Sequence, residues 1–359
     1  MSRRRFAFNS SLITHHSSLI KTVSDDKTTN GERLAALVRS FGGRRVLVLG
    51  DLVADQFVFG EISRVSREAP VMILRHERTE TVPGGAANCA MNLASLGARA
   101  AVVGVVGEDE AGRELLAKLK DAGVDCGGVV VNAKQRTTTK VRLLAGHAHS
   151  PRQQVIRLDY ESAPLSDEEI IGEIARAAAE RSRGAGAVII SDYNYGVANA
   201  ETLDALRERA SGVPVLVDSR FRLAEFEGFT SATPNEDEVE QVVGRRLETD
   251  AELAEEGERL RERLGLESLL ITRGRNGMLL VERGRAGLFL EAVGTHDAVD
   301  VTGAGDTVIA TYALALASGA EAGDAARLAN HAGGIVVLKR GTACVHADEL
   351  VASVIEEGV

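Results

Sequence analysis

The sequence has few cysteines, no surplus of positive charge and no long apolar run. Its three cysteines, Cys89, Cys126 and Cys344, are widely spaced and form no Cys-x-x-Cys motif. This pattern disfavours a disulfide framework or a zinc site and indicates reduced thiols. The net charge of −10 argues against nucleic-acid or anionic-membrane partners, because no basic surplus exists to neutralise phosphates. No apolar run approaches transmembrane length. We therefore expect a soluble cytoplasmic protein.

A dinucleotide-binding fingerprint is also missing from the first candidate strand. Residues 46–49 form a short apolar run that ends in Gly50-Asp51, which is typical of a buried parallel strand. One glycine follows the strand, where a dinucleotide site would need Gly-x-Gly-x-x-Gly. Because ligands of open α/β sheets bind beyond the carboxyl ends of strands, Asp51 and Asp55 are candidate acceptors for sugar hydroxyls. The alternative is that both are solvated loop acids.

Beyond residue 97, strand patterns alternate with helix patterns. The sequence predicts strands at 100–106, 187–190 and 213–217, and helices at 110–122, 167–182, 200–210 and 251–264. Such alternation predicts an α/β fold, with a mostly parallel sheet covered by helices on both faces. The chain of 359 residues is long enough for one large or two modest domains, and we find no linker that would divide it.

Two β-rich segments, at about 56–82 and 135–160, interrupt the alternation. They predict a small separate sheet, which beside a sugar site would act as a lid that excludes water. Residues 1–43 are polar and largely without periodic pattern, apart from helical character at 32–40. We expect them to be a disordered extension, followed by one domain over 44–359.

The stretch from Asp300 to Thr307 has the sequence Asp-Val-Thr-Gly-Ala-Gly-Asp-Thr and precedes an apolar helical run. Small residues at 303–305 allow a ligand to approach the backbone, and the first N–H groups of a helix favour an anion. Asp306 would repel a phosphate, but it is suited to removing a proton from a hydroxyl while the N–H groups hold a phosphoryl group. The alternative is an ordinary first-turn aspartate.

Three further motifs could line a ligand site. Gly84 to Asn88 reads Gly-Gly-Ala-Ala-Asn before a helix, and Asn88 offers both a donor and an acceptor. Asn235 to Glu238 begins another helix, where Glu238 could hold a water of Mg²⁺ or simply belong to a cap. Residues 272–277 join two strands, either beside a nucleotide or as a glycine-relaxed hairpin.

Taken together and in this order, the motifs resemble the ribokinase (PfkB) family of carbohydrate kinases from about Arg44 to the C-terminus. Within that family the chain is most similar to the D-glycero-β-D-manno-heptose 7-phosphate kinases. That likeness rests on 50–55, 63–71, 84–97, 153–159 and 300–309. It implies a ribokinase-like fold and ATP-dependent phosphorylation of the anomeric hydroxyl of a heptose 7-phosphate. The product would be the 1,7-bisphosphate on the route to ADP-heptose for lipopolysaccharide.

The resemblance also implies residue roles. Asp306 would be the base, with the amides of Gly303, Ala304 and Gly305 around the phosphoryl group. ATP and Mg²⁺ would be served by Asn235, Glu236, Asp237, Glu238, Thr272, Arg273, Gly274, Gly277 and Asn330, with Glu238 holding Mg²⁺ through water. The sugar would contact Asp51, Asp55, Gly84, Gly85 and Asn88. Its 7-phosphate would meet the lid residues Lys140, Arg142 and Arg157, unless these are merely solvated. Asp300, Thr302 and Gly341 lie where the family often places a monovalent cation, which would be K⁺.

The sequence departs from the heptose kinases at two turns. Tyr195-Gly196 stands where a Lys-Gly pair is usual, and Asp218-Ser219-Arg220 stands for Asp-Pro-Lys, with Arg220 retaining a charge. The open alternatives are another PfkB sugar or sugar-phosphate kinase, such as a ribokinase or fructokinase, and a non-catalytic sugar-binding module. No His-x-Gly-His nucleotidyltransferase motif occurs, so we expect the kinase alone. An exposed lid edge would favour a homodimer.

Overall fold

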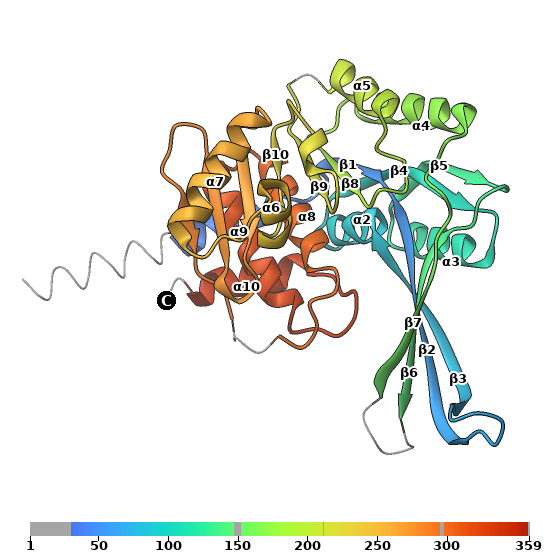
Figure 1. The fold of residues 1–359 in the computed structure, drawn as a ribbon. Helices are drawn as coiled ribbons and strands as arrows, with labels where there is room; N and C mark the ends of the chain where they lie inside the picture. The colour runs from blue at the N-terminus through green and yellow to red at the C-terminus, as the bar shows by residue number, and fades with distance from the viewer. Residues whose placement is uncertain (1–29, 147–151, 211, 295–297, 358–359) are drawn as a thin grey trace, which may run out of the picture.

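In the computed structural model, which describes residues 30–146, 152–210, 212–294 and 298–357, the predicted parallel sheet is the centre of the molecule (Figure 1). The described strands are ordered β13-β12-β11-β10-β9-β8-β1-β4-β5. Pairing is parallel from β11 through β5 and antiparallel at β11–β12 and β12–β13. Their bounds are β1 Arg45–Gly50, β4 Arg99–Gly107, β5 Asp125–Asn132, β8 Ala187–Asp192, β9 Val215–Ser219, β10 Ser231–Ala232, β11 Ser268–Thr272, β12 Met278–Glu282 and β13 Leu288–Leu290.

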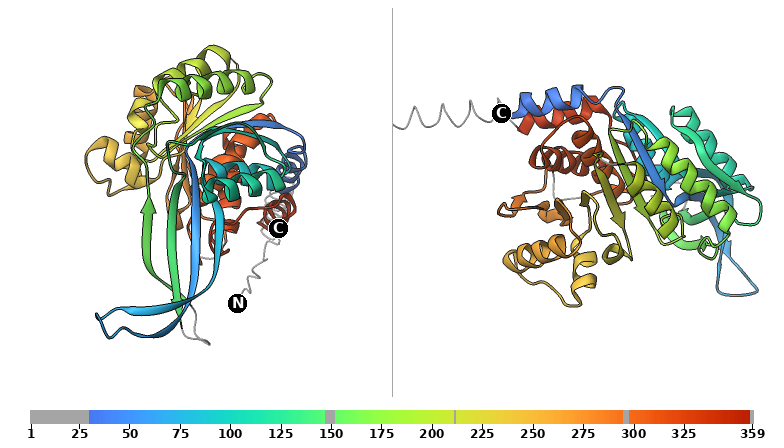
Figure 2. Two further views of the ribbon diagram at one scale, coloured as in Figure 1. Left: turned by 90° about the vertical axis from the view of Figure 1, so that its right-hand side faces the viewer. Right: turned by 90° about the horizontal axis from the view of Figure 1, so that it is seen from above.

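Helices cover both faces of this sheet (Figures 1 and 2). One apolar cluster joins the sheet to α2, α3, α8, α9 and α10, and a second joins it to α4, α5, α6 and α7. The bounds are α2 Ala86–Ser95, α3 Glu110–Asp121, α4 Glu168–Arg181, α5 Ala200–Arg209, α6 Glu236–Val243, α7 Asp250–Arg263, α8 Ala304–Ala317, α9 Ala322–Val336 and α10 Ala347–Glu357, with 3₁₀ turns η1 Leu223–Glu225 and η2 Gly274–Asn276. Strands such as β8 are buried on both faces, which is why they appear as continuous apolar runs in the sequence.

The two β-rich segments form a separate four-stranded sheet, in the order β3-β2-β6-β7. It comprises β2 Leu52–Val65, β3 Met72–Gly85, β6 Thr138–Gly146 and β7 Gln153–Tyr160, and it projects from one end of the body (Figure 1). We call this sheet the lid. Its inner ends lead into β1 and α2, so the lid is attached beside the carboxyl edge of the central sheet. The predicted fold class is confirmed.

The folded body begins before the boundary expected at residue 44. Residues 30–39 are helical, and Leu34, Ala35, Val38 and Phe41 are buried in the cluster that contains α9 and α10. These apolar side chains are spaced for one helix face, so residues 30–43 belong to the body and not to an extension. The rest of the expected extension, residues 1–29, lies outside the described part of the chain.

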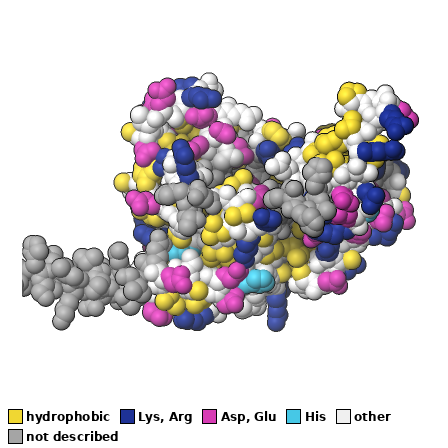
Figure 3. All heavy atoms as spheres, turned by 90° about the horizontal axis from the view of Figure 1, so that it is seen from below, with side chains coloured by type: hydrophobic (Ala, Val, Ile, Leu, Met, Phe, Trp, Pro, Cys, Tyr) yellow, Lys and Arg dark blue, Asp and Glu magenta, His cyan; other side chains and the backbone are white. Residues whose placement is uncertain are grey.

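Two surface properties bear on partners. Within the described residues, no helix has the length and apolarity needed to cross a membrane. On the face seen in Figure 3, Lys and Arg side chains are interspersed with Asp and Glu. That face therefore lacks the continuous basic surface that a nucleic-acid partner would favour.

Candidate active site

A cavity of about 440 Å³ lies between the lid and the carboxyl edge of the central sheet. The polar and charged residues that line it come from the lid, from the carboxyl ends of β8, β9, β10 and β11 and the turns that follow them, from the start of α8 and from the segment between α9 and α10. They include Asp55, Lys140, Arg142, Asp192, Tyr193, Asp218, Arg220, Thr233, Asn235, Glu238, Thr272, Thr302, Asp306 and Thr342. The buried hydroxyls of Thr233 and Thr342 have no hydrogen-bond partner within the described chain. Because buried polar groups normally find partners, these hydroxyls suit a polar ligand.

Asp306 lies at the floor of this cavity, in the first turn of α8, and is 3% exposed. Its Oδ2 accepts a hydrogen bond from Asn88 Nδ2 at 2.8 Å. Its Oδ1 accepts from the Tyr193 hydroxyl at 3.3 Å and the Cys89 thiol at 3.5 Å. Burial raises the pKa of Asp306 to about 6, although these three donors pull the pKa downward. The carboxylate is therefore ionised at neutral pH and is a stronger base than an exposed aspartate.

The predicted Gly84–Asn88 turn meets Asp306 through Asn88. Asn88 lies in α2, where Asn92 Nδ2 donates to its side-chain oxygen at 3.2 Å. The Thr307 hydroxyl in α8 in turn donates to Asn92 Oδ1 at 3.1 Å. This chain of amides fixes which end of Asn88 faces Asp306, so Asn88 presents its N–H₂ to the carboxylate. Asn88 positions the base and is absent from the cavity lining.

Glycines allow these close approaches. Gly303 precedes α8 with φ of 78°, and a Cβ there would lie 2.5 Å from Asn88 Nδ2. Gly85 has φ of 57°, and a Cβ on Gly84 would lie 2.6 Å from Asp55 Oδ2. The left-handed region favours glycine at 303 and 85, whereas Gly84 is required by space. Gly85 and Gly303 line the cavity, and Gly84 does not.

The N-terminus of α8 has no side-chain cap. The N–H of Ala304 donates to the Val301 carbonyl at 3.2 Å, so this amide is not available to a ligand as the sequence had suggested. The N–H groups of Gly305 and Asp306 come second and third in the helix, where no intrahelical acceptor exists. Gly303 and Gly305 line the cavity. The helix start can therefore receive an anion at the same place as the base.

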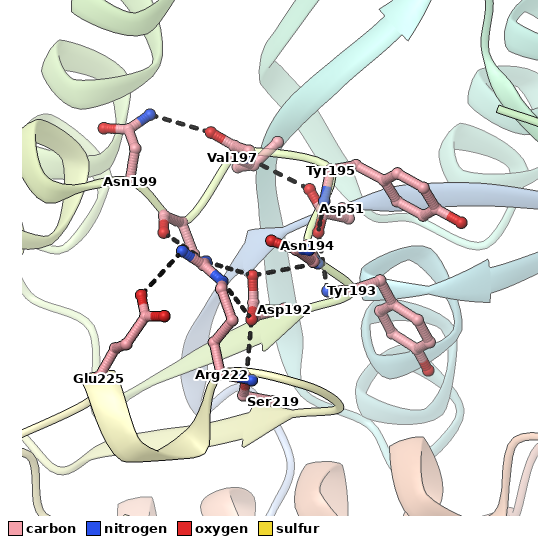
Figure 4. A network of polar contacts seen from close by, with 12 residues as sticks. Asp51, Asp192, Tyr193, Asn194, Tyr195, Val197, Asn199, Ser219, Arg222 and Glu225 are labelled. Atoms are coloured by element: carbon pink, nitrogen blue, oxygen red, sulfur yellow. Dashed lines mark hydrogen bonds and ion pairs between the residues drawn. The ribbon is translucent and has the colours of Figure 1, made fainter. Parts of the chain in front are cut away.

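Asp51 differs from its predicted role. Its carboxylate accepts hydrogen bonds from the backbone N–H groups of Tyr193, Tyr195 and Val197 at 2.8, 3.1 and 3.3 Å (Figure 4). Burial raises its pKa to about 6, and it does not line the cavity. Asp51 therefore shapes the turn that carries Tyr193, and its oxygens are occupied by backbone donors.

A second buried carboxylate holds the neighbouring turn. Asp192 accepts from Arg222 Nη2 at 2.6 Å and from the Ser219 hydroxyl at 2.7 Å (Figure 4). Arg222 also donates to the Ala198 carbonyl at 2.8 Å. Hydrogen bonds and an ion pair to Asp192 thus connect the turns that follow β8 and β9. Ser219, which replaces the usual proline, donates one of these hydrogen bonds.

The basic residues of the lid are distributed differently from the prediction. Arg142 forms an ion pair with Asp55, and both side chains are largely buried. Arg157 pairs with Asp159 at 2.8 Å, is 50% exposed and does not line the cavity, so it is not placed to meet a substrate phosphate. Lys140 lines the cavity, with its Nζ 5.3 Å from the centre of the Tyr193 ring.

A second cavity, of about 210 Å³, adjoins the first and shares Thr272, Val301 and Gly305 with it. It is lined mainly by apolar and small residues, among them Met278, Val293, Val308, Gly333 and Val337, with Gly274, Gly277 and Asn330. A flat aromatic base fits such walls. Three residues expected to serve the nucleotide, Glu236, Asp237 and Arg273, are absent from both cavities; Arg273 pairs with Glu236 and Asp250 instead.

Glu238 combines both roles considered for it. It forms a capping box with Asn235, with bonds of 2.8 and 2.9 Å, and it also lines the main cavity. Burial raises the pKa of both Glu238 and the nearby Asp218. Within the described residues, no set of three His, Cys, Asp or Glu side chains could enclose a metal. These two acids fit an ion that keeps most of its water, as Mg²⁺ does.

The three residues considered for a monovalent cation are joined by one carboxylate. Asp300 accepts hydrogen bonds from the N–H of Thr302 at 3.0 Å and of Gly341 at 2.9 Å. Burial opposes ionisation of Asp300, but these bonds outweigh it and the pKa lies below its ordinary value. The charged form of Asp300 is therefore favoured, so its carboxylate could serve a cation beside the start of α8.

The site thus combines a buried carboxylate, a helix start without a side-chain cap, two acids that could hold a hydrated ion, and an adjoining recess with mainly apolar walls. Together, fold and site define a phosphotransferase that acts on a sugar hydroxyl. The chain belongs to the family described as pfkB family carbohydrate kinase, whose model matches residues 44–348.

Relatives and solved structures agree with this assignment. "Bifunctional protein HldE" of Hahella chejuensis is 42% identical over 320 residues, which cover 88% of this chain and 65% of that protein. The protein of the same name from Caulobacter is 43% identical, covering 89% of this chain and 64% of its own length. This chain therefore spans less than two thirds of the length of these relatives.

Arabidopsis thaliana ribokinase, solved with ribose and ATP, matches 88% of this chain and 99% of its own, with a TM-score of 0.66 and 22% identity. Escherichia coli phosphofructokinase-2, solved with substrates and products, matches 87% of this chain and 98% of its own, with a TM-score of 0.70 and 21% identity.

Sequence reasoning gave several residues of the site no role there. Tyr193 and Cys89 both contact Asp306, and Asp218 and Arg220, which were noted only as part of a turn that departs from the family pattern, line the cavity. Tyr193 and Arg220 follow buried strands and Asp218 lies near the end of one, so their position at a carboxyl end was an available signal. Nothing in the sequence indicated that Cys89 faces the base.

Proposed function

We propose that this chain is an ATP-dependent kinase that phosphorylates O1 of D-glycero-D-manno-heptose 7-phosphate, giving the 1,7-bisphosphate. The observation that carries the transfer chemistry is Asp306, buried beside free amides and reached by Asn88 and Tyr193. The heptose phosphate is favoured by the motifs shared with that group of kinases. The identity of about 42% to proteins named HldE over most of the chain also supports it.

The residues of the site fit an in-line transfer. The sugar hydroxyl would lie against Asp306, which takes its proton as the new O–P bond forms. The bond between the γ-phosphorus and its bridging oxygen breaks, and ADP leaves. The amides of Gly305 and Asp306 would face the charge that spreads over the phosphoryl oxygens. The proton on Asp306 then passes to solvent after the product leaves.

The two cavities would receive opposite ends of the nucleotide. The apolar recess around Met278 and Val308 would hold the base, and Thr272 and Asn235 would face the phosphates. Glu238 and Asp218 would hold Mg²⁺ through water, which would neutralise charge on the phosphates. Asp300, with Thr302 and Gly341, would anchor a monovalent cation, K⁺, near α8. We place the protein in the cytoplasm, where ATP is available.

A panel of acceptors tests the substrate. With ATP and Mg²⁺, ADP release should be fastest by kcat/KM with D-glycero-D-manno-heptose 7-phosphate, and slower with ribose, fructose and fructose 6-phosphate. Mass spectrometry of the product should show one added phosphate. Faster turnover of ribose or fructose would favour the second candidate, a kinase for another sugar. The presence of Tyr195 in place of the usual lysine supports that candidate. No turnover of any acceptor would favour a sugar-binding module.

A further inference from the structure

The cationic side chains that line the main cavity differ in whether they form an ion pair. Three cationic side chains line it: Arg142, Lys140 and Arg220. Arg142 is neutralised by Asp55. Neither Lys140 nor Arg220 forms an ion pair with a carboxylate in the part of the chain that the structure describes; their recorded side-chain contacts are with the rings of Tyr193 and Phe221. Lys140 and Arg220 are therefore two cations without an ion pair among the described residues, in a cavity that also contains Asp218, Glu238 and Asp306.

The two cations enter the cavity from different elements, Lys140 from the lid and Arg220 from the turn after β9, where the charge of Arg220 also acts on Asp218 and Glu238. Lys140 is on β6, in register with Asp55 of β2, and its ammonium faces the ring of Tyr193, whose hydroxyl touches the base. Arg220 follows β9, and its N–H donates to the Asp192 carbonyl at 3.2 Å. The nucleotide recess lies on the other side of Gly305 and Thr272, beside β11 and β12.

Resting on the proposed function, we infer that Lys140 and Arg220 form the subsite for the phosphate group of a phosphorylated sugar acceptor. Arg220 would contribute a planar, forked donor, and Lys140 a compact charge. Two unpaired like charges in one partly buried cavity repel each other, and a phosphate dianion between them removes that repulsion. Burial lowers the pKa of Lys140, Asp55 opposes this, and the charge of Arg220 lowers the pKa further, which agrees with the two cations lying near each other.

This subsite replaces the one expected from the lid alone. Arg157 is directed along the lid surface toward Asp159, and Arg142 is engaged by Asp55. The new member, Arg220, comes from the body of the molecule. A phosphate bound here would bridge lid and body, which an unphosphorylated sugar could not do. The site would therefore discriminate between a sugar phosphate and the same sugar without its phosphate.

The test compares acceptors in pairs: heptose 7-phosphate with heptose, and fructose 6-phosphate with fructose. The variants are Lys140→Met, which keeps an unbranched chain over the Tyr193 ring, and Arg220→Gln. The control is Arg157→Gln, a lid arginine outside the cavity. Each lost charge-assisted contact should lower the ratio of kcat/KM for phosphorylated over unphosphorylated acceptor by roughly tenfold to a hundredfold. Arg157→Gln should keep the wild-type ratio, and the KM for ATP should change little in all three.

The outcomes separate this inference from the proposed function. If fructose 6-phosphate is the better acceptor but the variants lose the preference for phosphate, the heptose assignment fails and the subsite stands. If the wild type prefers unphosphorylated sugars, the subsite is refuted while a sugar kinase remains. Equal losses on both members of a pair, or a raised KM for ATP, would assign the two cations to the transferred or nucleotide phosphates and overturn the inference.

Discussion

The carboxylates around the cavity are neutralised in different ways, and the difference indicates their roles. Asp55 is paired with Arg142, and Asp192 with Arg222. Asp306, by contrast, receives hydrogen bonds only from neutral donors among its recorded partners. A cation at hydrogen-bond distance would lower the pKa of Asp306 and weaken it as a base. Neutral donors orient the carboxylate while burial keeps its pKa near 6.

Replacing Asp306 with asparagine should separate catalysis from stability. We expect kcat to fall roughly a thousandfold or more, because the base is lost, with little change in the KM for ATP. At pH 7 the melting temperature should stay equal or rise, since the buried charge is removed. Its folded pKa of about 6, against an ordinary value of 3.8, corresponds to at most about 3 kcal/mol.

The same variant gives a pH test with a defined sign. The raised pKa means that the folded wild type binds a proton more tightly than the unfolded chain, so the wild type gains relative stability as pH falls from above 6 to below 4. The difference in melting temperature between variant and wild type should therefore shrink over that range. Near wild-type turnover of the variant, or a difference that grows on acidification, would contradict the assigned role.

For single residues, the sequence identified Asp306, which the structure places in the cavity, but not the side chains that surround it. The Gly-Ala-Gly-Asp motif is local, so its residues could be read from spacing. The hydrogen bond from Tyr193 to Asp306 joins residues 113 positions apart, and the capture of Arg142 by Asp55 joins residues 87 apart. Such pairings depend on how strands and loops are packed, which periodicity does not report.

Among the elements, α8 has a glycine with positive φ at each end, and the two glycines have different surroundings. Gly303 precedes its first turn with φ of 78°, against Asn88, and Gly319 follows its last turn with φ of 89°. A Cβ on Gly303 would lie 2.5 Å from Asn88 Nδ2, whereas one on Gly319 would meet nothing within 4 Å. Both glycines therefore adopt positive φ, but only Gly303 is in close contact with a residue that hydrogen-bonds Asp306.

This pair of glycines provides a matched experiment. Gly303→Ala and Gly319→Ala should each lose roughly 1 kcal/mol or more of stability, because alanine resists positive φ. Only Gly303→Ala should also lose activity, by roughly a hundredfold, since the added methyl displaces Asn88 and tilts the helix amides. Thermal unfolding and kcat measured well below the melting temperature give the comparison. Equal activities for the two variants would show that the start of α8 does not position the phosphoryl group.

The elements themselves were largely predictable, because long apolar periodicity is a local property. The α/β alternation and the lid segments were correctly predicted. The helix at 30–39 was assigned to an extension because Gly42-Gly43 separates it from the first strand and the residues before it are largely polar. Its apolar positions form one helix face, but α9 and α10, which cover that face, lie near the other end of the chain. Local spacing therefore could not show what buries it.

For the whole molecule, the lid has two chemically different faces. Strand register places Asp55, Lys140 and Asp159 side by side, and likewise Phe57, Arg142 and Arg157. Because alternate residues point to opposite faces, the other face carries Val58, Val141, Leu143, Ile156, Leu158 and Tyr160. The first face includes the cavity residues. The second leaves Ile156, Leu158 and Tyr160 exposed by 52%, 49% and 41%, which is typical of a surface that another protein covers.

We expect a second copy of this chain to cover that apolar face, with two lids packed face to face in a homodimer. Replacing Ile156 and Leu158 together with lysine would place two charges in the contact, which should convert a dimer into a monomer. Val131→Lys is the control, because Val131 is 52% exposed but lies on β5, an edge strand of the central sheet and not a strand of the lid. Sedimentation velocity should show a dimer for the wild type and the control, and a monomer for the double variant. A monomeric wild type at micromolar concentration, or a double variant that remains dimeric, would exclude this interface.

The apolar face is opposite the one that carries Lys140. Loss of the dimer should therefore alter activity only by loosening the lid as a whole, which raises the KM for the sugar before it lowers kcat.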